Sequence, residues 1–219
     1  MKGLLVKDFL LTTKVQGKVF GALVLFAIFM TFTTDNPFFI VSYLTFICSI
    51  FSINAIAYDE FGNGYSFLFT LPVDVRNYVT SKYIFSAIMT MASAVISFSI
   101  ASVVCIVKGK GGEIAEYGIP TFGIVAFAFV YLAILIPLEL KFGSEKSRML
   151  IFGVIGGSMA IIFAVVKIIG QNQELSNKCM RVITGLDITQ TIGMALGVSV
   201  ISMAVSYLLS LKIMRNKEF

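Results

Sequence analysis

The chain has 219 residues, of which 58% are hydrophobic and only 13% are charged. A chain this apolar cannot present a water-soluble surface, so its composition predicts an integral membrane protein. Its net charge of +5 is scattered among apolar stretches and forms no dense basic stripe, which argues against nucleic acid as a partner. Histidine, the commonest general base and metal ligand, is absent. We therefore expect no catalytic residue, no metal site and no cofactor-binding residue on this chain.

Residues 2–18 are too polar to cross a membrane but have the pattern of a surface helix, and the elbow is placed at 2–16. In helical projection, Phe9 and the neighbouring apolar side chains share one side. The opposite side carries Lys7, Lys14 and Lys18, a pattern typical of a helix that lies on an anionic membrane surface. We therefore predict an N-terminal elbow helix whose lysines face lipid phosphates. A cleaved signal peptide is the alternative, but the apolar run that follows lacks a small-x-small cleavage site.

Six apolar stretches follow, each long enough for a helix to cross the ~30 Å hydrocarbon core of a bilayer. The chain is therefore expected to be an all-α, polytopic membrane protein with one transmembrane domain over residues 1–219. No acidic residue lies near the middle of any stretch, which argues against a carrier coupled to ions or protons. The predicted spans are 17–34, 37–57, 75–107, 119–140, 149–169 and 190–212.

The basic residues indicate the orientation of these spans. Most Lys and Arg residues fall at the two termini and in the loops after the second and fourth spans. Because basic residues are retained on the cytoplasmic side, both termini are predicted to be cytoplasmic in a multi-pass protein of the cell membrane. Cys48 and Cys105 lie in apolar runs, where cysteine acts as a small hydrophobic residue, and Cys179 is expected in an outer loop.

Residues 58–74 form a loop between the second and third spans that is of intermediate polarity. A short helix is predicted to begin near Asp59 and to end at Leu71 and Pro72, because proline lacks a backbone donor and disfavours a helical residue before it. So short a helix must pack on something, either a partner protein or the membrane interface. We expect it to dock on a partner through side chains that do not hold the fold. Its apolar face consists of Phe61, Tyr65, Leu68 and Phe69.

Glu139 is the acidic residue closest to the interior of a span, at the end of the fourth stretch and beside Lys141. Charges often end a span, so the simpler interpretation is an interfacial carboxylate with a local partner. The alternative is a charge at the inner mouth of a transport path. The sequence leaves both open.

Several short motifs in the chain resemble those of a known family. They are Asn63-Gly64-Tyr65, Leu71-Pro72-Val73, Ser81-Lys82-Tyr83, Ile136-Pro137-Leu138 and Lys141-Phe142-Gly143. With the elbow and the six spans, they resemble the membrane permease subunit of a type-2 ABC exporter. The branch resembled most is the bacterial permeases that export phenol-soluble modulins and bacteriocin-type peptides, and the resemblance covers essentially the whole chain.

This resemblance implies that the loop helix is a coupling helix that contacts a separate ABC ATPase subunit. ATP and magnesium would bind on that partner, since this chain has no G-x-x-x-x-G-K-[ST] motif. A second permease, identical or a sister chain, would complete the path for an amphipathic peptide, with antibiotics and lipids as other substrates. A stand-alone channel or secondary carrier and a membrane immunity protein are the competing functions. The implied coupling interface consists of Phe61, Asn63, Gly64, Tyr65, Leu68, Phe69, Leu71 and Pro72.

Overall fold

The computed structural model describes residues 2–34, 38–60, 64–70, 73–109, 111–171 and 188–217. Throughout these ranges the regular structure is helical, which confirms the all-α class. Long apolar segments favour helices in a membrane because every backbone polar group is then satisfied within its own segment. The helices are α1 (Lys2–Thr34), α2 (Phe38–Glu60), α3 (Gly64–Thr70), α4 (Val75–Val107), the 3-10 helix η2 (Gly111–Glu113), α5 (Ile114–Gln171) and α7 (Ile188–Arg215).

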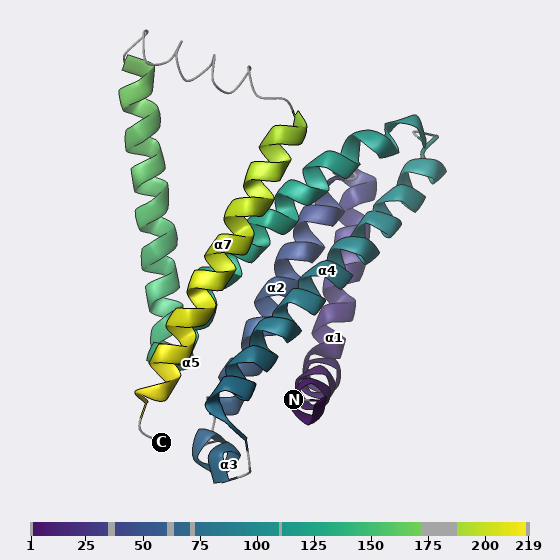
Figure 1. The fold of residues 1–219 in the computed structure, drawn as a ribbon. Coiled ribbons are helices and arrows are strands. Elements are labelled where there is room, and N and C mark those ends of the chain that lie inside the picture. The colour runs from purple at the N-terminus through teal and green to yellow at the C-terminus, as the bar shows by residue number, and fades with distance from the viewer. Residues whose placement is uncertain are drawn as a thin grey trace.

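The long helices form one bundle in which α2 packs against α1, α4 and α5, and α7 packs against α5 and α4. The two ends of the chain and α3 lie at the same end of this bundle, which we call the α3 end (Figure 1). The turn between α4 and α5 lies at the opposite end. Within the described residues, five helical segments are long and apolar enough to cross a membrane, which makes the chain multi-pass. They are Lys2–Thr33, Phe38–Glu60, Val75–Val107, Tyr117–Gly143 and Gln190–Arg215.

Helix α5 contains a sharp bend at the α3 end. Gly143 has φ 76° and ψ 171°, a backbone conformation that is essentially restricted to glycine. The part of α5 after this residue turns back and runs away from the α3 end (Figure 1, green). The predicted span at 149–169 lies in this returning part, which is helical but is not one of the five candidate spans. Six spans therefore stay a prediction.

The predicted elbow and the predicted first span form one continuous helix, α1, so a separate elbow helix is not confirmed. In Figure 1 the first turns of α1 are seen nearly along the helix axis and the rest from the side, so the helix bends along its length. Asp8, Thr12 and Gln16, spaced four residues apart, are buried. The N-terminal turns therefore pack on α2 and α4 instead of lying free on a membrane surface.

The main hydrophobic core lies at the α3 end and joins five helices. Residues of α3 contribute to it, so this seven-residue helix, which is too short to be stable alone, is held by packing on the bundle. The core is also where α4 and α5 approach the last turn of α7. Its buried members are Ile53, Ile56, Tyr65, Leu68, Tyr78, Val79, Tyr83, Leu132, Leu135, Ile136, Leu140 and Met214.

Candidate functional site

Four charged side chains meet where α1, α2 and α4 come together at the α3 end. Lys82 of α4 donates to both carboxylate oxygens of Asp8 in α1 at 2.8 Å, and its Nζ lies 2.6 Å from Oδ2 of Asp59 in α2. Lys7 also pairs with Asp59, and its Nζ lies 3.5 Å from Oδ1 of Asp8. Two lysines and two aspartates therefore balance one another in charge. We call Lys7, Asp8, Asp59 and Lys82 the charge cluster.

Three of the four side chains of the charge cluster are buried, and the fourth, Lys7, is 34% exposed. The side chains of Lys82, Asp8 and Asp59 are 1%, 0% and 5% exposed. Buried charges are tolerated when they are paired and fully hydrogen-bonded. The ammonium group of Lys82 meets this condition, because it contacts both aspartates and also donates to the carbonyl oxygen of Ala55 at 3.3 Å. The cluster therefore fixes α1, α2 and α4 against one another.

Tyr78 connects the charge cluster to α3. Its hydroxyl donates to Oδ2 of Asp59 at 3.1 Å, and the Nζ atom of Lys82 lies 5.2 Å from the centre of its ring. On its other side, the Tyr78 ring meets the Tyr65 ring of α3 edge to face, with ring centres 6.0 Å apart. An unbroken series of contacts thus runs from α3 through two aromatic rings to the three helices that the cluster joins.

The chain segment after α7 holds α3 from another direction. The Nζ atom of Lys217 lies 4.8 Å from the centre of the Tyr65 ring and donates to the carbonyl oxygen of Leu140 in α5 at 3.0 Å. Tyr65 is only 6% exposed, and this burial raises the pKa of its hydroxyl above the ordinary value. The phenol therefore stays neutral at physiological pH, and Tyr65 contacts both α4 and the C-terminal segment.

The structure describes part of the predicted coupling interface. Gly64 begins α3, and the buried side chains of Tyr65 and Leu68 belong to the chain's own core. They therefore hold the fold, in contrast to our expectation, because an apolar helix face can pack on its own chain as readily as on a partner. Docking of α3 on an ATPase stays a prediction. Four predicted residues and the side chain of Phe69 lie outside the described residues; the four are Phe61, Asn63, Leu71 and Pro72.

Glu139 lies in α5 shortly before the bend and is 4% exposed. The hydroxyl of Ser147 donates to its carboxylate across the bend, so this carboxylate has a local partner. A role at the inner mouth of a transport path stays a prediction. At the bend itself, a side chain on Gly143 would collide with the carboxylate of Glu60 at the end of α2. Glycine is thus required at this position for its backbone conformation, whereas the Glu60 carboxylate, at the end of a flexible side chain, can move aside.

Sequence reasoning missed the charge cluster. Lys7 was expected to face lipid phosphates, but it pairs with Asp59 and Asp8, whereas Lys14 and Lys18 are exposed. One signal was present, because Asp8 is the only acidic residue in α1 and begins a polar stripe on a side of the helix away from the lysines. Within the described residues, no group of three or more His, Cys, Asp or Glu side chains can hold a metal ion.

Comparison with known proteins identifies the family. Residues 3–215 match the family model described as "ABC-2 family transporter protein". No curated protein and no solved structure gives a match. The matched region extends from the first turn of α1 to the last residue of α7, so it includes the charge cluster, α3 and the bend of α5. The chain therefore belongs to the ABC-2 transporter family, whose members are the membrane components of transporters.

Proposed function

We propose that this chain is the permease subunit of an ATP-driven exporter and that its α3 end contacts a separate ATPase subunit. Family membership supports the general role. The observation that carries the more specific proposal is the series of contacts from Tyr65 through Tyr78 to the charge cluster. A partner that moves α3 would act through these contacts on α1, α2 and α4 at the same time.

The chemistry of the contacts favours movement of α3 together with the neighbouring helices over breakage of individual contacts. Separating Lys82 from Asp8 or Asp59 would leave an unpaired charge in a buried site, which is strongly unfavourable. Moving Tyr78 alone would leave the Asp59 carboxylate without one of its donors. The path of least cost is therefore for α3 to move together with the three helices joined by the cluster.

The proposed orientation places the α3 end in the cytoplasm, where a soluble ATPase would be found. Both ends of the chain lie at this end of the bundle (Figure 1), and most of the Lys and Arg residues are predicted to lie on the same side. Basic residues favour the cytoplasmic side. The cell membrane of a bacterium is the proposed location.

A second permease subunit, identical or a sister chain, is proposed to complete the transport path. Each subunit would then supply half of the helices that enclose the path. ATP and magnesium are assigned to the ATPase. The proposed substrate is an amphipathic peptide, and this assignment is supported by the motifs that resemble peptide exporter permeases, including Asn63-Gly64-Tyr65 and Ile136-Pro137-Leu138.

Inverted membrane vesicles test this function. Vesicles from cells that make the chain and its ATPase should accumulate a fluorescent amphipathic peptide when ATP is supplied. Vesicles with a hydrolysis-deficient ATPase provide the matched control and should accumulate none. Uptake without nucleotide would indicate a channel or a secondary carrier, and protection of cells against a toxic peptide without any ATPase would indicate an immunity protein.

A further inference from the structure

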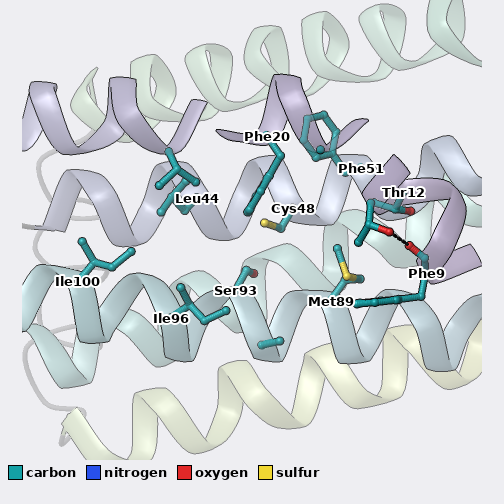
Figure 2. Close-up of a pocket in the computed structure, with 14 residues that line it drawn as sticks. Phe9, Thr12, Phe20, Leu44, Cys48, Phe51, Met89, Ser93, Ile96 and Ile100 are labelled. Carbon is teal, nitrogen blue, oxygen red and sulfur yellow. Dashed lines mark hydrogen bonds between the residues drawn. The ribbon is translucent and has the colours of Figure 1, made fainter. Parts of the chain in front are cut away.

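An apolar groove of about 420 Å³ lies between α1 and α4, with α2 as its floor (Figure 2). Leu44 and Cys48 on the floor are each 2% exposed. On the two rims, Phe9 of α1 and Ile96 of α4 are 56% and 55% exposed. The groove is therefore open along its length to the medium around the helix bundle.

The groove has the length of a lipid chain in one leaflet. Its lining on α4 extends from Met89 to Ile100, which is about 16 Å of helix at 1.5 Å per residue. One leaflet supplies about half of the ~30 Å hydrocarbon core, or about 15 Å. The groove can thus accept one acyl chain that enters from the α3 end and reaches about the middle of the bilayer.

The two ends of the groove differ in polarity. Val24, Leu44 and Ile100 line the end away from α3, whereas Thr12 and Thr13 line the end nearer to it. Lys14 does not itself line the groove, but it directly follows Thr13 on α1 and is exposed, so its cation is available at this polar end. An apolar groove with a cation at one end complements an amphiphile that carries a negative headgroup.

We propose that this groove binds one acyl chain of an anionic phospholipid, with the phosphate beside Lys14. The lipid would bridge α1 and α4 next to the helices that the charge cluster joins. This inference requires only that the chain is a membrane protein, and it stands apart from the nature of the exported substrate and from the ATPase contact.

Tryptophan fluorescence tests the proposal, because the chain contains no tryptophan. Phe51→Trp places one fluorophore in the groove wall, and Phe127→Trp places one at a position that is 62% exposed on α5. Each variant is reconstituted with brominated phosphatidylglycerol or brominated phosphatidylcholine, which quench tryptophan on contact. We expect the anionic lipid to quench Trp at position 51 at a several-fold lower mole fraction than the zwitterionic lipid, and the two lipids to quench equally at position 127.

Two pairs of matched substitutions, made in the Phe51→Trp chain, show whether the groove itself is responsible. An added side chain would meet open space at both Gly17 and Gly21, but only Gly17 lines the groove. Gly17→Leu should therefore displace the lipid, and Gly21→Leu should not. Lys14→Gln should weaken the preference for anionic lipid about five-fold, the value of one lysine near a membrane surface, whereas Lys2→Gln should leave it unchanged.

A second measurement covers the case in which the tryptophan variants do not fold. Native mass spectrometry of the purified wild-type chain should detect bound phosphatidylglycerol, and Gly17→Leu should lose it. Equal quenching by both lipids at position 51, or no retained lipid on the wild type, would overturn the proposal. Loss of a dimer in Gly17→Leu without loss of lipid would also overturn it, by showing that a second copy of the chain covers the groove.

Discussion

Replacing Lys82 by methionine should destabilise the protein strongly. The methionine keeps most of the volume of the side chain but removes the ammonium group that contacts Asp8 and Asp59 at 2.8 Å and 2.6 Å. Because the Asp8 side chain is fully buried, its carboxylate cannot gain compensating contacts with water. After the substitution, the cation that remains near Asp8 is Lys7, whose Nζ lies 3.5 Å from Asp8. Lys7 already pairs with Asp59.

The magnitude follows from the burial of the cluster. Removing one partner of a buried ion pair typically costs about 3–5 kcal/mol. At about 2–4 °C per kcal/mol for a chain of this length, Lys82→Met should lower the melting temperature by about 6–20 °C. The double variant Asp8→Asn with Lys82→Met leaves Lys7 paired with Asp59 and should recover about 2 kcal/mol of this loss, since contacting residues couple by about that amount.

The assay is thermal unfolding of the detergent-solubilised protein, followed by the amount of monodisperse material that survives heating. Lys18→Met provides the control, because Lys18 is exposed on α1 and its loss should change stability by about 0.5 kcal/mol or less. A Lys82→Met chain as stable as the Lys18→Met chain would refute the reasoning. A double variant no more stable than Lys82→Met would show that Asp8 and Lys82 do not depend on each other.

Three further predictions concern the bend, the α3 core and the topology. Gly143→Ala should cost about 1–3 kcal/mol for the backbone conformation alone. Thermal scans should show little rescue by Glu60→Ala, because the Glu60 carboxylate can move away from the added methyl group; a neutral Gly143→Ala would contradict the bend. Tyr65→Ala with Leu68→Ala should lower the amount of permease in the membrane, since each removes a buried side chain worth about 2–5 kcal/mol; normal levels with a lost ATPase complex would instead place both at a partner interface. A membrane-impermeant maleimide should label intact cells but miss Cys179→Ser, and labelling that needs permeabilised cells would contradict the orientation.

The sequence predicted the helical spans well because hydropathy reports directly on the cost of placing a segment in a bilayer. Four of the five candidate spans in the described residues agree with predicted spans to within a few residues, and the long third one, Val75–Val107, has the same bounds. The first differs because α1 continues from Lys2 without a break. A helix that packs on neighbouring helices can begin with polar residues, and hydropathy alone does not detect this.

The periodicity of α3 predicted an apolar face but not the packing of Tyr65 and Leu68 in the chain's own core. Periodicity shows that Tyr65 and Leu68 share one side of a helix. The same periodicity is found whether that side packs on another protein or on the chain's own core. The deciding contact is with Tyr78, which lies in the next helix. Such a contact becomes visible only when the helices are placed in space.

The charge cluster could not be predicted from local patterns, because its members are far apart in the sequence. Lys7 and Asp59 are separated by 52 positions and Asp8 and Lys82 by 74. Lys7 and Asp8 lie in the predicted elbow, whereas Asp59 follows the second predicted span and Lys82 lies in the first turns of the third, where an interfacial charge is common. Their pairing depends on how α1 bends toward α2 and α4, which the composition of no single segment determines.

Site-specific photocrosslinking tests whether α3 contacts the ATPase subunit. Thr70, the last residue of α3, is exposed and can be replaced by a photoreactive phenylalanine without disturbing the core. A matched probe at Gly112, which is exposed in η2 at the opposite end of the bundle, reports on non-specific reaction. We predict that the probe at position 70 crosslinks to the ATPase subunit and that the yield of this crosslink changes when ATP is added. The probe at position 112 should give no crosslink to the ATPase. Crosslinks from position 70 to lipid alone, with the ATPase present and active, would contradict the proposed contact.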